Sequence, residues 1–167
     1  MPTLFNYSPE SVNCLIGGFI QITGFVDGTF ISVDKDEMPY SSIRMPDGTI
    51  ARKNNNSQTY TITITLHNGA DTNNLLTKMW QLDEATKGRG KFPLLIKDQS
   101  GSDLLFSTES WIEGIPSMTK SNAIDSRVWV IKSAYAVINI GGNETQSDLI
   151  NDIVNIAASA LPGLGLF

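Results

Sequence analysis

The strongest signal along this chain is a strict alternation of apolar and polar residues, which is typical of a β-strand with one buried face. Residues 60–67 alternate without a slip. The apolar face of this segment holds Tyr60, Ile62, Ile64 and Leu66. The opposite face carries Thr61, Thr63 and Thr65 together with His67. We therefore predict a half-buried strand over 60–67.

Alternation recurs along the rest of the chain and predicts a mainly β protein. The further strands expected are 19–26, 29–33, 92–96, 103–112 and 127–140. Asp27-Gly28 is a turn dipeptide, which favours a hairpin between the first two of these strands. Ser100-Gly101 marks a second turn, between the third strand and the fourth.

Two segments change to the helical period. The first covers about 71–87, with Asp71 as a candidate N-cap and Gly88 as the glycine expected to end the helix. Its apolar stripe is narrow, so this helix should lie on the open face or at the end of a sheet. The second helix is expected to begin at Ser147 and to end before Pro162.

A long polar connection, residues 34–57, separates two of the expected strands. It contains Pro39, the turn sequence Pro46-Asp47-Gly48 and three consecutive asparagines. More than twenty residues of this kind are unusual in a compact domain. We interpret the segment as an extended hairpin arm that becomes ordered against a partner.

Length and composition limit the classes of function. The chain has 167 residues and a mass of 18.2 kDa, which fits one domain with a real core. Only 17% of residues are charged and the net charge is −5, which disfavours both disorder and the wrapping of nucleic acid. We therefore expect a folded protein whose partners are not chosen by a strongly basic surface.

The chemistry available to a catalytic or metal site is sparse. Cys14 and His67 are the only residues of their kinds, so neither a disulfide nor a Cys- or His-rich metal cluster can form within the chain. The basic stretch 87–91 lacks the residues of a phosphate loop and ends a helix instead of opening one. We predict no enzymatic activity, no metal and no cofactor.

Charge is distributed unevenly along the chain. Residues 1–40 carry one base and five acids, a balance of −4. Residues 41–100 carry eight bases and five acids, a balance of +3, and residues 101–167 carry three bases and seven acids, a balance of −4. Segments of opposite sign are consistent either with head-to-tail contacts between copies or with solvated faces that happen to differ.

Targeting signals are not evident. The first basic residue is Lys35, so no secretory signal is visible, and no apolar run approaches the ~18 residues that span a bilayer. We expect a soluble product of a reducing cytoplasm without a membrane-spanning segment.

Several segments resemble, in order, those of the tail tube proteins of contractile-tailed bacteriophages. They are 16–31, the alternating residues 62–66, the helix through Leu75 and Leu76, the stretch 90–98, and the ending 129–143. The resemblance covers roughly residues 5–143, and the ordered series is more specific than any single segment. It ceases after Asn143, where this chain continues with an extension.

The resemblance implies a β-sandwich or partly closed β-barrel with one flanking helix. Residues 1–143 would form this domain, with the long arm at 34–57, and 144–167 would add a C-terminal helical extension. Six copies would form a ring, and rings would stack head to tail into a tube inside a contractile sheath in the virion tail. The other partners implied are the tape measure, baseplate and tail terminator proteins, with assembly in the host bacterial cytoplasm.

The same resemblance suggests residues for contacts and for the tube lining. The arm would reach the next ring, which makes Asp34, Asp36, Glu37, Arg44, Arg52 and Lys53 candidates for contacts between rings. Thr61, Thr63 and Thr65 are candidates for the lining, although this face could also meet solvent or a covering helix. Duplex DNA would pass non-specifically, because a neutral or acidic lining does not hold its phosphates.

Two alternatives stay open at this point. The tube protein of a phage-derived injection device would share the fold and assembly but carry effector proteins instead of DNA. A soluble β-sandwich that binds sugar or peptide would suit the composition and the three tryptophans. Such a module would form a small monodisperse particle with an accessible aromatic groove.

Overall fold

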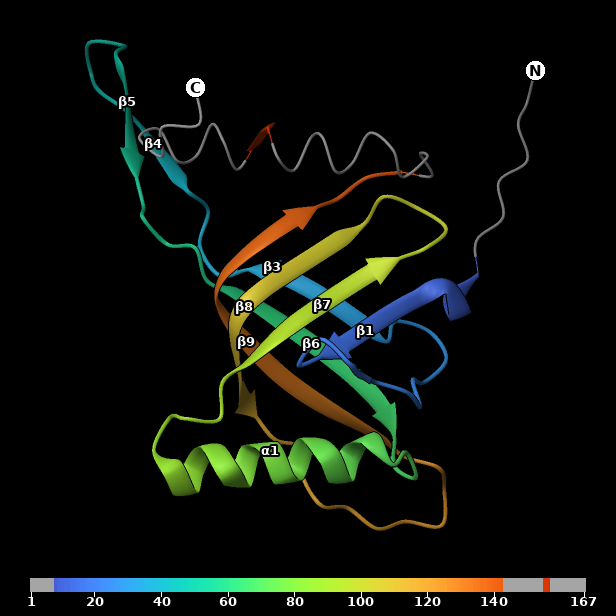
Figure 1. Cartoon of the computed structure of the whole chain (residues 1–167). Helices are drawn as coiled ribbons and strands as arrows, with labels where there is room; N and C mark the ends of the chain where they lie inside the picture. Colours follow the sequence, from blue (N-terminus) through green and yellow to red (C-terminus); the bar gives the residue numbers. More distant parts are fainter. Residues whose placement is uncertain (1–7, 143–154, 157–167) are drawn as a thin grey trace, which may run out of the picture.

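A computed structural model describes residues 8–142 and 155–156, and these form a mainly β fold with one α-helix (Figure 1). A short 3-10 helix, η1 (Pro9–Ser11), precedes a seven-stranded antiparallel sheet. Its strands are β1 (Val12–Ile16), β2 (Ile20–Gln21), β3 (Ile31–Lys35), β6 (Tyr60–His67), β7 (Phe92–Asp98), β8 (Leu104–Gly114) and β9 (Ser126–Asn139). Their order across the sheet is β2-β1-β7-β8-β9-β6-β3.

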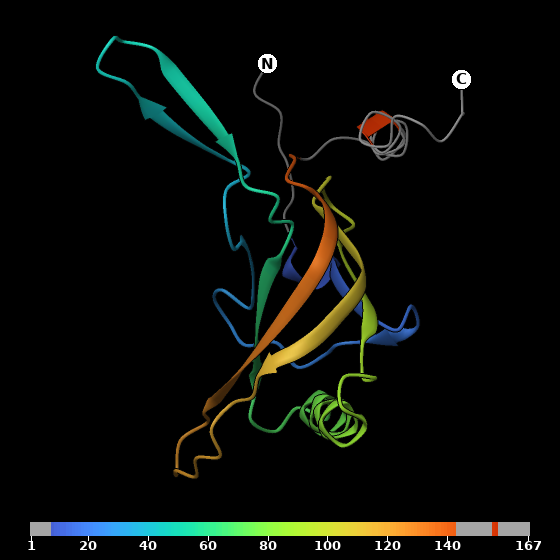
Figure 2. The ribbon, with the colours of Figure 1, turned by 90° about the vertical axis from the view of Figure 1, so that its left-hand side faces the viewer.

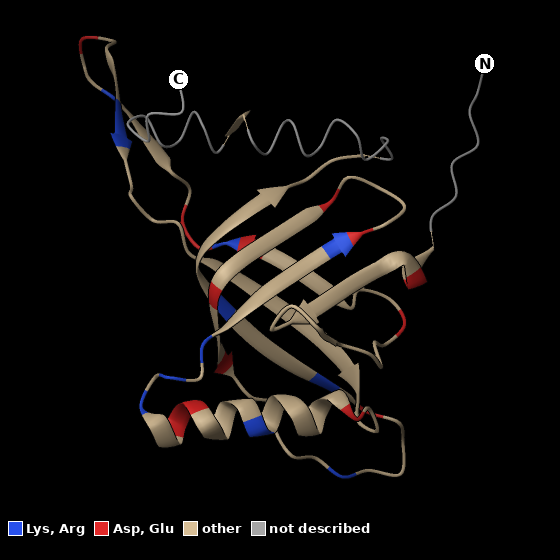
Figure 3. Ribbon diagram, in the orientation of Figure 1, with Lys and Arg blue, Asp and Glu red and all other residues tan. Residues whose placement is uncertain are grey.

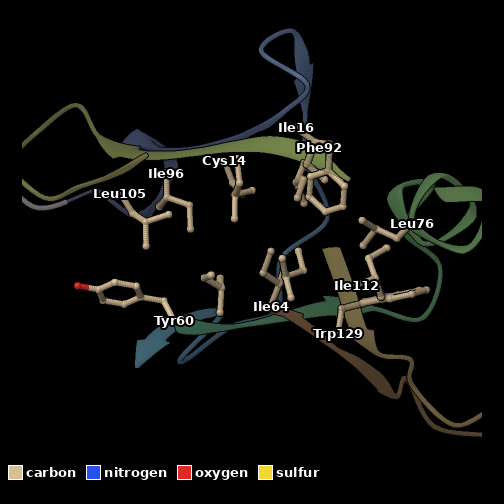
Figure 4. Packing of buried hydrophobic residues seen from close by; sticks show 14 of the residues in the cluster. Cys14, Ile16, Tyr60, Ile64, Leu76, Phe92, Ile96, Leu105, Ile112 and Trp129 are labelled. Atoms are coloured by element: carbon tan, nitrogen blue, oxygen red, sulfur yellow. The ribbon is translucent and has the colours of Figure 1, made fainter. Parts of the chain in front are cut away.

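The sheet folds over on itself and encloses one hydrophobic core. Side chains from β1 and β7 face those of β6 and β9 across the core (Figure 4). In β6 the apolar face is buried at every second residue, as the alternation predicted. Strands β3 and β2 are the two edges and do not pair with each other, so the fold is a sandwich that stays open on one side.

Register shifts between β8 and β9 help the sheet to bend. The pairing slips between Ser107 and Glu109 and again between Ile112 and Gly114, and such bulges increase the local twist and curvature. Ser107 and Ser133 are both buried there, and their hydroxyl oxygens lie within hydrogen-bond distance of each other and of the carbonyl oxygen of Tyr135, at 2.8 and 3.0 Å, so one hydroxyl donates to the carbonyl while it accepts from the other. These hydroxyls satisfy a backbone group at the irregular point of the ladder.

Helix α1 (Thr72–Thr86) closes one end of the folded sheet (Figures 1 and 2). Leu76 is fully buried against the core. The indole Nε1 of Trp129 on β9 donates to Oδ1 of Asn73 at 2.9 Å, which ties the helix to the sheet. The position expected from the narrow apolar stripe is thus confirmed.

The ends of α1 differ in detail from the prediction. Asp71 occupies the N-cap position, but its side chain makes no capping hydrogen bond. At the other end the left-handed conformation begins one residue earlier than expected, at Lys87, with φ of 56°. Gly88 follows with φ of 98°, and its N–H donates to the carbonyl of Asp83 at 3.0 Å. The helix therefore ends on two successive left-handed residues.

The predicted hairpin between 19–26 and 29–33 is wrong. Only β2 is a strand in the first segment, and it pairs with β1 through a turn at Gly17-Gly18, both of which have positive φ. Strand β3 pairs instead with β6, in the register Ile31 to Ile64. The chain already turns at Gly17-Gly18, before Asp27-Gly28. Strand β3 then pairs over all five of its residues with the alternating strand β6.

The arm and the C-terminal extension have different outcomes. Strands β4 (Tyr40–Arg44) and β5 (Ile50–Asn54) form a separate two-stranded sheet that projects from the folded sheet, as predicted (Figures 1 and 2). We call residues 36–57 the arm. The expected C-terminal helix from Ser147 lies outside the described residues, except for Asn155 and Ile156, which are helical.

Candidate assembly surfaces

The part of the chain that the structure describes contains no group of three or more metal-ligating side chains. Within the same residues, no helix has the length and apolar character needed to cross a bilayer. Cys14 lies fully inside the core, where burial raises the pKa of its thiol to about 12. The surfaces that stand out are those suited to contacts with other protein chains.

The arm exposes almost every residue of its two strands. All five residues of β4 are exposed, and in β5 only Ala51 is half-buried. The large apolar side chains Ile43 and Ile50 are 63% and 59% exposed. A two-stranded hairpin with no packed face is marginal in water. The arm is therefore a surface that gains by docking.

Register divides the arm into two faces. Arg44 pairs with Ile50, and Ser42 pairs with Arg52. Because side chains alternate along a strand, Arg44, Ile50 and Arg52 share one face, on which the guanidinium carbon of Arg52 lies 4.1 Å from the ring centre of Tyr40. Lys53 and Ile43 lie on the opposite face. Two of the three predicted basic contact residues are thus brought together around one exposed isoleucine.

The predicted acidic contact residues lie at the end of β3 and the start of the arm. Asp36 accepts hydrogen bonds from the Thr61 hydroxyl and, at 3.1 Å, from Nζ of Lys132. The Thr61 hydrogen bond is the main reason that the pKa of Asp36 lies below its usual value; burial opposes this shift, and the hydrogen bonds and charge of Lys132 and Thr59 support it. Asp34 accepts from the Ser32 hydroxyl at 3.1 Å, and Glu37 is exposed. Asp36 anchors the arm to its own sheet.

The threonine face of β6 lies on the outside of the folded sheet. Thr61, Thr63 and Thr65 are half-buried, and α1 does not cover them because it packs across the end of the core. Their neighbours on β9 are Lys132, Val130 and Val128 in register. The face therefore combines hydroxyls with valines around Thr63 and Thr65, and carries the charged groups of Asp34, Asp36 and Lys132 around Thr61.

Apolar side chains also gather at the α1 end. Leu82 on α1 is 57% exposed, and Met118 and Ile124 in the connection between β8 and β9 are 83% and 82% exposed. This connection lies at the same end of the molecule as the helix, away from the arm (Figures 1 and 2). The sequence analysis did not identify these exposed residues, because isolated apolar residues in a loop follow no periodic pattern.

A cavity of about 420 Å³ opens between β1 and β3, on the unpaired side of the sandwich. Its apolar lining includes Val12, Ile31, Val33 and Leu104. Asp98 and Asp103 also line it, and a neighbouring hollow that shares Gly28 and Phe30 is lined by Glu10 and Asp27. We call these two adjacent hollows the acidic opening. No local signal in the sequence could have revealed it, because its walls come from segments far apart in the chain.

Asp98 is held as a charged group at this opening. Burial opposes its ionisation, but hydrogen bonds from the Ser100 hydroxyl and N–H and from the Ser11 hydroxyl outweigh burial and lower its pKa. These donors lie 2.8, 2.9 and 2.8 Å from Oδ1. Asp103 accepts from the N–H of Gly141 at 2.8 Å. The opening is therefore both apolar and negatively charged.

The fold recurs in contractile injection systems. One chain of the anti-feeding prophage cap, described as its tube terminating cap, aligns with a TM-score of 0.52 and 14% identity over 83% of this chain and 94% of its own. A chain of the sheath-tube complex of the extracellular contractile injection system PVC gives a TM-score of 0.53 at 16% identity, covering 81% and 92%. A chain of the PVC sheath/tube terminator gives 0.50 at 13% identity, covering 83% and 100%. These likenesses define the fold class.

The family is shown by sequence. Structural protein ORF10 of Pseudomonas phage KPP10 is 32% identical over 152 residues, which are 87% of this chain and 88% of ORF10. The chain belongs to this family of phage structural proteins. No protein-family model matches it. The expected relation to phage structural proteins is confirmed. A structural role is consistent with a sequence that has one cysteine and one histidine.

Proposed function

We propose that this chain is the tail tube protein of a contractile-tailed phage. Six copies form a ring, and rings stack into the inner tube of the tail. The observation that carries this proposal is the coincidence, in one chain, of membership in a phage structural family and a fold found in tube and tube-terminator assemblies. The exposed arm supplies the protruding element that a head-to-tail polymer needs.

The tube would conduct duplex DNA passively. DNA carries one negative charge per ~1.7 Å of its axis, so a basic lining would hold it strongly. The threonine face, with Thr61, Thr63 and Thr65, would suit the lining because it offers hydroxyls and its one lysine, Lys132, is paired with Asp36. We expect the interior of the tube to let DNA slide instead of binding it.

The proposed partners follow from the same assembly. The sheath would surround the tube, the tape measure would set its length, and the baseplate and terminator would meet its two ends. The protein would assemble in the bacterial cytoplasm and remain in the virion tail. Residues 1–143 would form the tube wall, and 144–167 would be an addition to it.

A tail terminator is the second candidate function, because two of the structural neighbours belong to terminator assemblies. A terminator would form one ring that caps the tube and would not polymerise. An inner tube of an injection device that carries effectors would share the tube architecture, so the cargo separates it from a phage tube.

Negative-stain microscopy of the purified full chain tests the proposal. Stacked rings or tubes are the expected result. Single rings that never stack would favour the terminator. A monomer at high concentration in the presence of the other tail components would overturn both. The copy number in purified virions, measured by quantitative mass spectrometry against the sheath protein, is a second test: a tube protein should match the sheath, and a terminator should be far rarer.

A further inference from the structure

The arm and the acidic opening are complementary in charge. Residues 40–54 of the arm carry three bases, Arg44, Arg52 and Lys53, and one acid, Asp47. The residues that line the acidic opening include Glu10, Asp27, Asp98 and Asp103, and none of them is Lys or Arg. Figure 3 shows basic residues on the arm and acidic residues on the turns beside β1. Opposite potentials of this kind favour encounter and fix orientation.

The two surfaces are also complementary in polarity and shape. On the arm face with Arg44 and Arg52, the exposed Ile50 lies directly across from Arg44 and two residues before Arg52 on β5. The mostly apolar cavity of about 420 Å³ in the opening is large enough for an isoleucine side chain, and Asp98 and Asp103 are among its lining residues. An apolar group flanked by two guanidinium groups matches an apolar hollow flanked by carboxylates.

The positions of the two surfaces suit a head-to-tail contact. Ile31 and Val33 on β3 line the opening, and the arm begins directly after the other end of the same strand, at Asp36. The arm projects away from the folded sheet and from the opening of its own copy (Figures 1 and 2). The same two surfaces can meet between copies, and such an unlike pairing repeats from one copy to the next.

We propose that the arm of one copy docks on the acidic opening of the next copy, with Ile50 entering the cavity and Arg44 and Arg52 reaching the carboxylates of its rim. This inference rests on the proposed self-assembly and names the acceptor surface for the arm. The charge of the C-terminal segment makes it a poorer match for the acidic opening than the arm, because residues 143–167 carry three acids and no base.

Cysteine pairs test the contact in the full chain. Thr29 is an exposed residue of the opening, so a chain with Ile50→Cys and Thr29→Cys should form disulfide-linked ladders on oxidation of assembled material. The native Cys14 should stay silent, because it is buried and its pKa is about 12. Two matched controls should not form ladders: Ile43→Cys with Thr29→Cys, from the opposite face of the arm, and Ile50→Cys with Lys120→Cys, near α1.

Charge reversal provides a second test. The double variant Arg44→Glu with Arg52→Glu should raise the protein concentration needed for assembly by roughly tenfold or more, since it replaces attraction by repulsion at the rim. Combining it with Glu10→Lys and Asp27→Lys should restore most of the loss. Lys53→Glu, on the other face of the arm, should change assembly much less.

The outcomes separate this inference from the proposed function. Tubes whose ladders come from the Lys120 pair, or equally from the Ile43 pair, would overturn the acceptor surface and leave the tube proposal standing. Failure of the charge rescue would count against the acceptor in the same way. If the native chain forms neither rings nor tubes and no cysteine pair gives a ladder, the proposed function fails and this inference fails with it.

Discussion

The folded sheet and the arm are built from the same kind of antiparallel ladder, but different contacts hold them in place. In β6 four of eight residues are buried in the core, whereas β4 has none. The sheet keeps its shape through side chains that exclude water, and the arm keeps its shape through its own hairpin and its anchor at Asp36. The folded sheet has the contacts it needs within one copy, whereas the arm could gain contacts from a second copy.

Removing the arm should produce the largest effect. Deletion of residues 38–54 should leave a folded subunit, because the arm contributes nothing to the core, and should abolish stacking. Circular dichroism and thermal unfolding would check the fold, and negative-stain microscopy would check assembly. Tubes of normal length from the deleted chain would reject the assignment of the arm as an assembly element.

Truncating one isoleucine in each region sharpens the contrast in stability. Ile64→Ala, in the core, should lower the free energy of unfolding by about 2–5 kcal/mol, because it leaves a cavity among packed side chains. Ile43→Ala, on the arm, should change it by no more than about 0.5 kcal/mol. Urea unfolding of the two variants measures both values. Equal losses would mean that the arm is part of the cooperative unit.

A smaller effect is expected where α1 meets the sheet. Trp129→Phe removes the indole donor to Asn73 and should cost about 1–2 kcal/mol. Trp111→Phe is the matched control, because the indole of Trp111 donates to Glu113 at an exposed position, and the expected cost is below about 0.5 kcal/mol. Urea unfolding would distinguish them, and a reversed order would contradict the role of Trp129 as a tie between helix and sheet.

The smallest effect concerns the anchor of the arm and depends on pH. The pKa of Asp36 is lowered in the folded chain, so its ionised form stabilises the fold above its unfolded value of about 3.9, and this stabilisation is lost as pH falls through the folded value. Asp36→Asn should therefore flatten the loss of stability on acidification below about pH 5. Urea unfolding at stepped pH tests this. The control Glu37→Gln, at the exposed neighbouring residue, should leave the pH dependence of stability the same as in the native chain.

Local patterns predicted the parts of the fold that local forces determine. The alternation in 60–67 defined β6 and its buried face, the helical period located α1, and the long polar stretch at 34–57 indicated the arm. In each case the preference of a segment agrees with its final environment. The resemblance to a phage family added the class of protein, which no single motif could supply.

Contacts between distant segments were beyond the reach of local patterns. Gly24 adopts φ of +86°, and a side chain there would collide with Ala70. The hydrophobic run around it looked like a strand, although β3 is the segment that pairs with β6. The acidic opening was missed for the same reason, since Val12, Val33 and Leu104 meet only when the sheet folds over.

The single thiol of Cys14 can report on local unfolding of this protein. Because the side chain has no exposed surface, a thiol reagent can reach it only during moments when β1 separates from its neighbours. The rate of labelling therefore measures how often β1 separates from its neighbours. Comparing this rate before and after the proposed self-assembly would show how far neighbouring copies slow the separation of β1, with no probe added to the chain.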